Sequence, residues 1–584
     1  MFKISYISIL ISIFFSISNT IAATKAELIL FNGKFSNPSI TAVAMSEGRI
    51  VAVGNNGIIK DHQGQGTQTI NLNGRMVIPG LNDSHTHLIR GGLNYNMELR
   101  WDGVSSLSRA LELLKEQAAR TPKGQWVRVV GGWSEYQFEE RRLPTLEEIN
   151  EATGDTPAFI LYQYSLGYLN KAAIRTLGYD KNTSYPGGEV ALDSKGEPTG
   201  LLLAKPSALI LYSTLVKAPT LNDKEKINSS IHYFRELNRL GITSAIDAGG
   251  GGQYYPNDYG AVRQLAKEGK LSVRIAYYLF AQNKGEELAE FTKWTENISP
   301  YHNDDMFRPN GLMMHGAGEN LTWAAADFEN FREPRPVFDD HMESELEPII
   351  RLLVKHRWPF RIHATYGESV ERFLDVIESV DRETPLNGLR WIIDHAETIS
   401  DESMSRIKKM GGGIAVQNRM LFQGEQFVKR YGAEAAQTAP PIRKMLKMGI
   451  PVGLGTDGTR VSSYNPWFSL YWAVSGKSFG GDSLFNEKNK LSRLEALQLM
   501  TKGSAWFSSE ETSKGAILPG EFADFAVLNK DYFTIPEEEI RSVQSVLTVV
   551  DGKVVYGSAE FSKLSPALPE IIPSWSPVQF YAEK

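Results

Sequence analysis

The sequence lacks cysteine, runs of one charge and, after its first residues, long hydrophobic runs. Without cysteine there are no disulfides and no thiolate ligands, so only histidine and carboxylate side chains remain to hold a metal. Only 10 of the 584 residues are histidine, and the net charge is −6. Nucleic acids and anionic membranes need a basic face, so neither is expected as a partner, and a small-molecule partner is favoured.

The first 23 residues differ from the rest of the chain. After Lys3 they contain the apolar stretch ISYISILISIFFSIS, followed by NTIAA, whose small residues suit a signal peptidase. This pattern predicts a signal peptide over residues 1–23, a mature chain beginning near Ala23 or Thr24, and a periplasmic or secreted protein without stable membrane association. The apolar core is short for a membrane span, but an uncleaved anchor stays open as the alternative.

Histidine and aspartate recur where apolar runs end. His85 and His87 lie in PGLNDSHTH, His363 in FRIHATY, His395 in WIIDHAE and Asp457 in VGLGTDG. Each run is typical of a buried strand, and His85 and His87 share one face because side chains alternate along a strand. Imidazole and carboxylate groups are ligands of zinc and similar ions. If the strands are neighbours in one sheet, these five side chains predict a metal site.

Strand and helix patterns alternate through most of the chain. Eight apolar runs predict strands: MVIPGLNDSHTH, GITSAIDAGG, LSVRIAYYLF, NGLMMHGAG, FRIHATY, LRWIIDHAE, GGGIAVQN and GIPVGLGTD. Between them, segments such as MESELEPIIRLLVKHR repeat apolar residues every three or four positions, which is typical of amphipathic helices. Eight such units predict an α/β fold of the (β/α)8 or TIM-barrel class over residues 80–508. Active sites of this fold lie at the C-terminal ends of the strands, where the candidate ligands lie.

Two regions depart from this repeat. Residues from about 100 to 225, after the first barrel strand, are rich in glycine, tyrosine and proline turns and predict an insertion that shapes the substrate pocket. Residues 24–79 and 509–584 each show short alternating strands. Neither end could bury a core alone, so together they predict one composite β-sandwich that brings the two ends of the chain together.

These motifs as a set resemble the amidohydrolase superfamily, and within it the YtcJ-like or amidohydrolase 3 group, over essentially the whole mature chain. The matching segments, in order, are IPGLNDSHTHL, GGW, GITSAIDAG, IHA, DHAE, GTD and KGAILPGEFADFAVL with TVVDGKVVYG. The resemblance implies a metal-dependent hydrolase of amide or other carbon–nitrogen bonds. It assigns His85 and His87 to the ligands of the first strand, His363 and His395 to the fifth and sixth strands, and Asp457 to the eighth.

One strand departs from the family pattern. Binuclear members carry a fourth-strand lysine that is carboxylated and bridges two metals, followed by an aspartate, but LMMHGAGE has Met313 and Ala317 at those positions. The resemblance to mononuclear members then implies one divalent ion, with zinc favoured, held by the ligands named above. His315 and Glu319 in the same stretch could substitute for the bridge, but a structural role is favoured for both.

The function expected from these motifs is hydrolysis by metal-activated water. Asp457 would accept the proton of the water and pass it to the leaving nitrogen, while His395, where it is not a ligand, would hydrogen-bond the water or the developing oxyanion. Deamination of a cyclic amidine and a non-catalytic periplasmic protein that binds a metal or ligand are the alternatives. Trp133, Tyr164 and Tyr168 of the insertion suit core and pocket positions equally, and a homo-oligomer is left open.

Overall fold

The computed structural model describes residues 25–183, 187–205, 208–298, 300, 311–327, 330–335 and 337–583. The predicted signal peptide, residues 1–23, lies outside these ranges. Within them, no helix is both long enough and apolar enough to cross a membrane.

Eight parallel strands form one sheet in the order β19-β18-β17-β16-β15-β14-β13-β6. Their bounds are β6 Leu81–Thr86, β13 Ile242–Asp247, β14 Arg274–Leu279, β15 Leu312–Ala317, β16 Phe360–Ala364, β17 Trp391–His395, β18 Gly413–Gln417 and β19 Val452–Gly455. Every residue of these strands is buried, as expected for parallel strands covered on both faces. The prediction of a TIM-like barrel from the eight apolar runs is confirmed.

The first and last strands meet through polar contacts. Asp83 on β6 accepts hydrogen bonds from the backbone N–H of Thr456 at 3.0 Å and from its hydroxyl at 2.5 Å. The N–H of Asp457 donates to the carbonyl of His85 at 2.9 Å. Gly455 makes this approach possible, because a Cβ there would lie 2.8 Å from the backbone nitrogen of His85. The seam of the barrel therefore fixes His85 beside Asp457.

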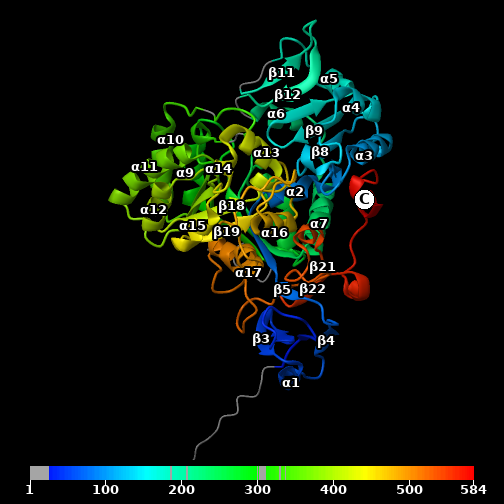
Figure 1. The fold of residues 1–584 in the computed structure, drawn as a ribbon, viewed down its shortest axis with the longest axis vertical. Coiled ribbons are helices and arrows are strands. Elements are labelled where there is room, and N and C mark those ends of the chain that lie inside the picture. The colour runs from blue at the N-terminus through cyan, green and yellow to red at the C-terminus, as the bar shows by residue number, and fades with distance from the viewer. Residues whose placement is uncertain are drawn as a thin grey trace, which may run out of the picture.

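Amphipathic helices cover the outside of the barrel (Figure 1). Helix α11, for example, buries Val370, Phe373 and Ile377 at three- and four-residue spacing. The helices of this layer and its loops are α2 Leu88–Asn94, α7 Asp223–Arg239, α8 Gly260–Lys267, α9 Glu287–Asn297, α10 Met342–Lys355, α11 Gly367–Glu383, α12 Asp401–Lys409, α13 Arg419–Tyr431, α14 Ala433–Ala436, α15 Ile442–Lys447, α16 Pro466–Ser475 and α17 Arg493–Gln498.

The segment between β6 and α7 forms a second sheet in the order β11-β12-β10-β9-β8-β7. Its elements are β7 Glu98–Leu99, β8 Val127–Val130, β9 Ala158–Tyr162, β10 Leu166–Leu169, β11 Glu189–Leu192, β12 Pro198–Leu203, α3 Leu107–Arg120, α4 Leu146–Thr153, α5 Lys171–Leu177 and α6 Leu209–Leu215. Trp133 and Tyr168 belong to an apolar core of this segment. Gly131, with φ +64°, allows the segment to meet the barrel, since a Cβ there would lie 1.7 Å from the carbonyl of Arg460.

Residues near the two chain ends form two four-stranded sheets, β3-β2-β1-β4 and β22-β21-β20-β5. Their strands are β1 Leu28–Phe31, β2 Ala42–Ser46, β3 Arg49–Gly54, β4 Gln68–Asn71, β5 Val77–Pro79, β20 Phe525–Leu528, β21 Ser545–Val550 and β22 Lys553–Gly557, with α1 Asn56–Ile59 after β3. Leu30 and Val43 of the first sheet share one apolar core with Phe525 and Leu547 of the second.

The chain leaves these sheets after β22 and runs along the barrel and the insertion. The carbonyl of Pro569 lies 3.1 Å from Nε2 of His232 on α7, and the guanidinium of Arg120 on α3 lies 4.0 Å from the ring centre of Phe580. The C-terminal end therefore lies beside α3, at a distance from the β1–β4 sheet (Figure 1).

Candidate metal centre

The structure brings the five predicted side chains together at the C-terminal end of the barrel strands. His85 lies in β6, His363 in β16 and His395 at the end of β17, while His87 follows β6 and Asp457 follows β19. Each of the five residues is at most 3% exposed. Buried ionisable groups are costly unless they pair with one another or bind a metal.

His85, His87 and Asp457 form one group. Oδ1 of Asp457 lies 3.1 Å from Nε2 of His87 and 3.5 Å from Nε2 of His85. One donor atom from each side chain lies within 4.8 Å of the other two, which is the spacing of ligands around one ion.

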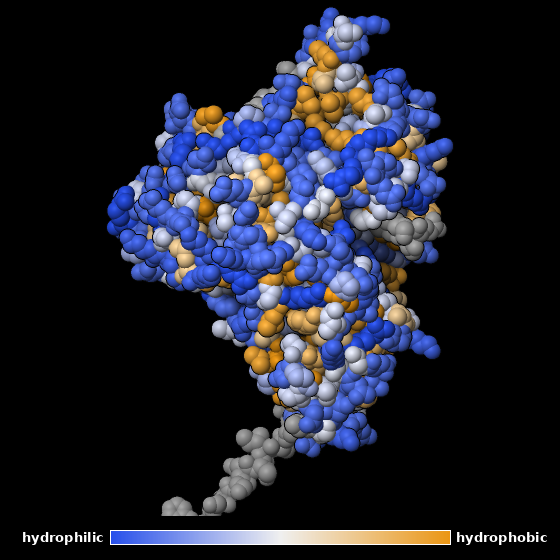
Figure 2. Space-filling view, in the orientation of Figure 1, coloured by the Kyte–Doolittle hydropathy of each residue, from blue (hydrophilic) through white to orange (hydrophobic). Residues whose placement is uncertain are grey.

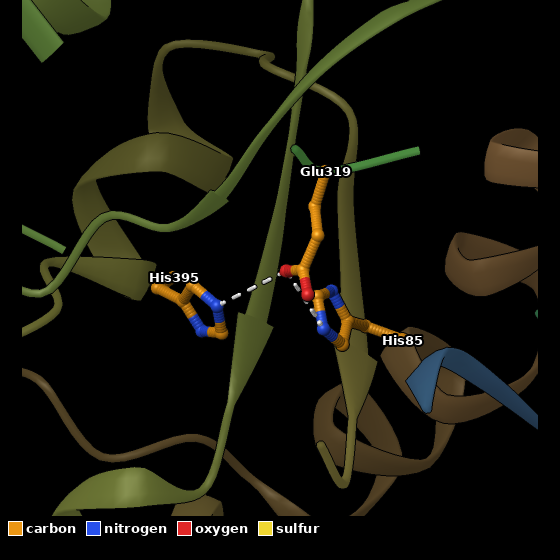
Figure 3. A group of neighbouring side chains, drawn as sticks. All are labelled: His85, Glu319 and His395. Carbon is orange, nitrogen blue, oxygen red and sulfur yellow. Dashed lines mark ion pairs between the residues drawn. The ribbon is translucent and has the colours of Figure 1, made fainter. Parts of the chain in front are cut away.

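Glu319, two residues past the end of β15, is the sixth member of the cluster. Its Oε2 lies 3.2 Å from Nδ1 of His363, 3.5 Å from Nε2 of His85 and 3.8 Å from Nε2 of His395. Figure 3 shows its carboxylate between His85 and His395. This position makes Glu319 a candidate ligand, in addition to the structural role favoured from the sequence. The sequence pointed to Glu319 only through its place after LMMHGA, because it lies beyond the end of β15 and the turn that follows sets the direction of its side chain.

Buried neighbours hold the first two histidines in orientation. Nδ1 of His85 lies 3.1 Å from Oδ1 of Asp394 and 2.8 Å from Arg361, which itself pairs with Asp394. Nδ1 of His87 contacts the carbonyl of Gly249. Both rings therefore turn Nε2 towards the cluster, as ligating histidines with a fixed outer nitrogen do. Sequence reasoning did not identify Asp394 or Arg361, although each lies on the same strand as a predicted ligand.

The two carboxylates of the cluster are ionised. Burial alone would raise the pKa of Asp457, but the imidazoles of His85 and His87 hold that pKa well below its usual range. Burial would also raise the pKa of Glu319, but hydrogen bonds with His363 and His395 hold that pKa well below its usual range. Both groups are thus available as acceptors and as metal ligands near neutral pH.

The histidines differ in their protonation. Burial lowers the pKa of His395 to about 3, so this ring is neutral near pH 7. Burial also disfavours the charged form of His85, but Asp394 raises its pKa to about 10. A cation that binds Nε2 of His85 therefore has to displace a proton, and metal affinity should rise with pH.

The donors fit a divalent metal of the zinc type. Nε2 of His85 and Nδ1 of His395 are buried and form no hydrogen bond within the described part of the chain. A buried nitrogen without a partner is costly, and a cation would satisfy Nε2 of His85. The side chains that could hold the metal are His85, His87, His363, His395, Asp457 and Glu319.

Backbone strain occurs at two of these residues. His395 has φ 76° and Asp457 has φ 54°, in the left-handed region that residues other than glycine rarely adopt. Such a conformation costs about 1–3 kcal/mol and persists where the surrounding structure enforces it. At Asp457 the backbone hydrogen bond to His85 across the barrel seam does so.

The cluster opens into a cavity of about 600 Å³. His87, Glu319, His363 and Asp457 line this cavity, and so does Tyr164 of the insertion. The aromatic side chains among the other lining residues are Tyr212, Tyr254, Phe280 and Trp323. Most of the face in Figure 2 is hydrophilic, with apolar side chains gathered near the insertion at the top of the view and again in its lower part. A small molecule with an apolar part suits this cavity.

The other residues singled out on the fourth strand lie in packed surroundings. Met313 packs inside the barrel in a cluster with Tyr278 and Phe507. The ring of His315 lies 5.1 Å from the ring of Tyr278, and burial lowers the pKa of His315 to about 3. Ala317 is buried in the main core. These contacts agree with the structural role favoured for His315.

Two proteins resemble the chain in sequence over nearly its whole length. The YtcJ protein of Bacillus subtilis (strain 168) is 28% identical over 538 residues, which cover 88% of this chain and 96% of the relative. The N-substituted formamide deformylase of Arthrobacter pascens is 22% identical over 539 residues, which cover 89% of this chain and 95% of the relative.

The fold is shared with a solved structure as well. An uncharacterised metal-dependent hydrolase from Pyrococcus horikoshii OT3 has a TM-score of 0.62 at 21% identity, covering 88% of this chain and 99% of that one. A model of the amidohydrolase family matches residues 68–556. The chain therefore belongs to the amidohydrolase family, as its motifs predicted, and is a hydrolase of carbon–nitrogen bonds.

Proposed function

We propose that the protein uses water to cleave an amide or a related carbon–nitrogen bond of a small molecule at the metal cluster. The observation that carries this proposal is the meeting of four buried imidazoles and two ionised carboxylates beside a cavity of about 600 Å³. The relative from Arthrobacter pascens is named for its action on N-substituted formamides. N-formyl compounds are therefore the first substrates to test.

We infer that zinc is the metal, because imidazole and carboxylate donors without thiolate suit it. The sequence predicted one ion, since Met313 removes the bridging lysine. Glu319 alters that expectation, because its Oε1 lies 3.7 Å from Nε2 of His87 and its Oε2 lies 3.2 Å from Nδ1 of His363. We propose that His85, His87, Asp457 and Glu319 would hold one ion and that His363 and His395, together with Glu319, would hold a second.

A divalent ion held by these residues would lower the pKa of a water molecule and polarise a substrate carbonyl. Side chains of the protein would transfer the protons. Asp457 is ionised, buried and lines the cavity, so it accepts the proton of the attacking water. It then donates this proton to the leaving nitrogen, acting first as general base and then as general acid.

His395 assists at the same centre. The ring is neutral, and where its Nε2 holds the second ion its proton would lie on Nδ1. Nδ1 lies 4.0 Å from Oδ2 of Asp457, where it would hydrogen-bond the water or the developing oxyanion. The same groups would serve deamination of a cyclic amidine, which stays the alternative reaction. A non-catalytic binding protein is disfavoured, because the chain belongs to the amidohydrolase family.

The purified protein is expected to contain zinc, at about two ions per chain, and to lose turnover when a chelator removes it. Elemental analysis measures the ions. The metal-loaded protein is then offered N-formyl compounds, N-acyl compounds, cyclic amides and cyclic amidines, with ammonia release identifying deamination. Added zinc should restore turnover to the chelated protein. Metal-free protein, or turnover that survives complete chelation, would contradict the proposal.

We also propose that the chain is exported and that its two end sheets act as one composite β-sandwich. The short apolar stretch before Ala23 supports export, and the shared core of Leu30 and Phe525 supports the sandwich. N-terminal sequencing of protein made by its natural host should find Ala23 or Thr24 first. Recovery of Met1 would refute cleavage.

A further inference from the structure

Arg90 is a buried cation with unused donors next to the metal cluster. It lies on α2, is 4% exposed and lines the cavity. Its Nη1 donates to the carbonyl of Gly251 at 3.4 Å, whereas Nε and Nη2 have no hydrogen-bond partner among the described residues. A Cβ on Gly250 would lie 2.9 Å from Nη1 of Arg90 and 3.3 Å from Nδ1 of His87. The guanidinium therefore adjoins a proposed metal ligand.

The unused edge of Arg90 is the one that binds carboxylates. Nε and Nη2 lie on one side of the guanidinium and can donate to both oxygens of a carboxylate at once. Elsewhere in this structure the same two atoms bind one carboxylate in the pairs Arg75–Glu560, Arg239–Glu236 and Arg274–Asp524. Arg274 is 8% exposed, so this edge is occupied by an acid even in a buried arginine of this protein.

No acid of the described chain takes this place at Arg90, because Nε and Nη2 have no hydrogen-bond partner there, and Asp247 and Glu319 favour its charged form only through space. The nearby Asp247 uses Oδ2 for the N–H of Ile89 and Oδ1 for the N–H of Gly249. Glu319 is turned towards the imidazoles. A charged edge that is buried without a partner is costly, so a partner from outside the chain is expected.

A second buried arginine strengthens the positive charge of this region. Arg460 is 8% exposed, and its guanidinium lies 4.6 Å from the ring centre of Tyr212, a residue of the cavity wall. Its Nη1 also has no hydrogen-bond partner in the described ranges. Burial, together with the like charge of Arg90, lowers the pKa of Arg460 to about 10. An anion would relieve this repulsion.

The remainder of the cavity wall includes many apolar side chains. Phe280 and Trp323 line the cavity, as do Val216 and Tyr254, which are 69% and 51% exposed. Exposed apolar side chains around a cavity indicate contact with an apolar part of a ligand.

We propose that the Nε and Nη2 edge of Arg90 is an anion subsite, and that the substrate is an amide that carries a carboxylate and an apolar group. Because Arg90 adjoins His87, a short link has to separate the carboxylate from the bond that is cleaved. The amide part of this inference rests on the proposed function, whereas the carboxylate part rests on Arg90.

The test uses the metal-loaded full chain and two probes that differ only at the anion, N-acetylphenylalanine and N-acetylphenylalaninamide. Calorimetric titration of the wild-type protein should give a Kd roughly tenfold or more lower for the acid. Arg90→Gln should lose this preference, and Arg90→Lys should keep part of it, because lysine keeps the charge without the two-donor edge. Lys284→Gln is the matched control, since it removes an exposed cation from the same cavity.

Equal binding of the two probes by the wild-type protein, or no binding of either, would overturn the proposal. A preference that Arg90→Gln retains would do the same. Thermal melting and elemental analysis show whether each variant is folded and metal-loaded. If Arg90→Gln fails to fold, an undiminished preference in Arg90→Lys is the overturning result. Turnover is measured separately, so a preference for the acid without any hydrolysis refutes the proposed function and leaves the anion subsite standing.

Discussion

Replacing Asp457 with asparagine is expected to lower turnover by roughly 10²- to 10⁴-fold, the range that general acid–base catalysis contributes. Asparagine keeps an oxygen of nearly the same shape but lacks a basic carboxylate, and because an amide is also a weaker ligand, zinc is supplied in excess so that the ions remain bound. The ionised state of Asp457 in its buried position is what the substitution removes. Elemental analysis together with kcat on the same sample checks both parts, and excess zinc should not restore activity.

His87→Ala supplies the contrast, because it removes a metal donor without removing the proposed proton carrier. Its activity should fall mainly through loss of the ion, and excess zinc should restore part of it. The two variants thus distinguish a residue that only binds the metal from one that also transfers a proton. If the metal-loaded Asp457→Asn protein turns over at a near-normal rate, Asp457 is not the proton carrier, whatever the metal content.

Glu319→Gln is expected to reduce the metal content from about two ions per chain to one or none. Its two oxygens face His87 and His363 at 3.7 and 3.2 Å, and an amide is a weaker ligand than the carboxylate it replaces. Loss of an outer neighbour of a metal typically costs 10–100-fold in affinity, so loss of a direct ligand should weaken binding by roughly 100-fold or more. Zinc titration against a competing chelator measures this change.

Glu425→Gln is the matched control for that experiment. Glu425 is a half-buried glutamate on α13 whose Oε1 accepts the N–H of Gly480 at 2.6 Å, and it is no part of the cluster. Its replacement should leave metal content unchanged. A wild-type protein with one ion, held as tightly by Glu319→Gln, would restore the one-ion arrangement predicted from the sequence and return Glu319 to a structural role.

The barrel could be predicted from the sequence because each of its strands has a recognisable local pattern of apolar residues. A parallel strand covered on both faces needs a short continuous apolar run, and FRIHA and WIIDH show this without any knowledge of the rest of the chain. The histidines that end those runs could be grouped for the same reason, since all strands of such a barrel point the same way.

Glu319 and Arg90 could not be assigned in this way. Glu319 stands beyond the end of its strand, so its side-chain direction depends on the turn that follows β15. Nothing in the local sequence distinguishes Arg90 from any other basic residue of a short helix. What singles it out is that the acids around it are already used, as Asp247 is by two backbone N–H groups. Which donors are left without partners depends on contacts between segments far apart in the chain.

The sequence by itself determined the order of strands and helices, the five candidate ligands and the family, because each rests on residue type and local spacing. Only the tertiary structure decided that a sixth side chain, Glu319, lies among the five candidate ligands and that Arg90 has an edge without a hydrogen-bond partner among the described residues. The physical reason is that hydrogen bonding and ion pairing depend on distances of a few ångströms between residues brought together by closure of the barrel. His85 and Asp457, 3.5 Å apart across the seam between β6 and β19, meet only because the barrel closes.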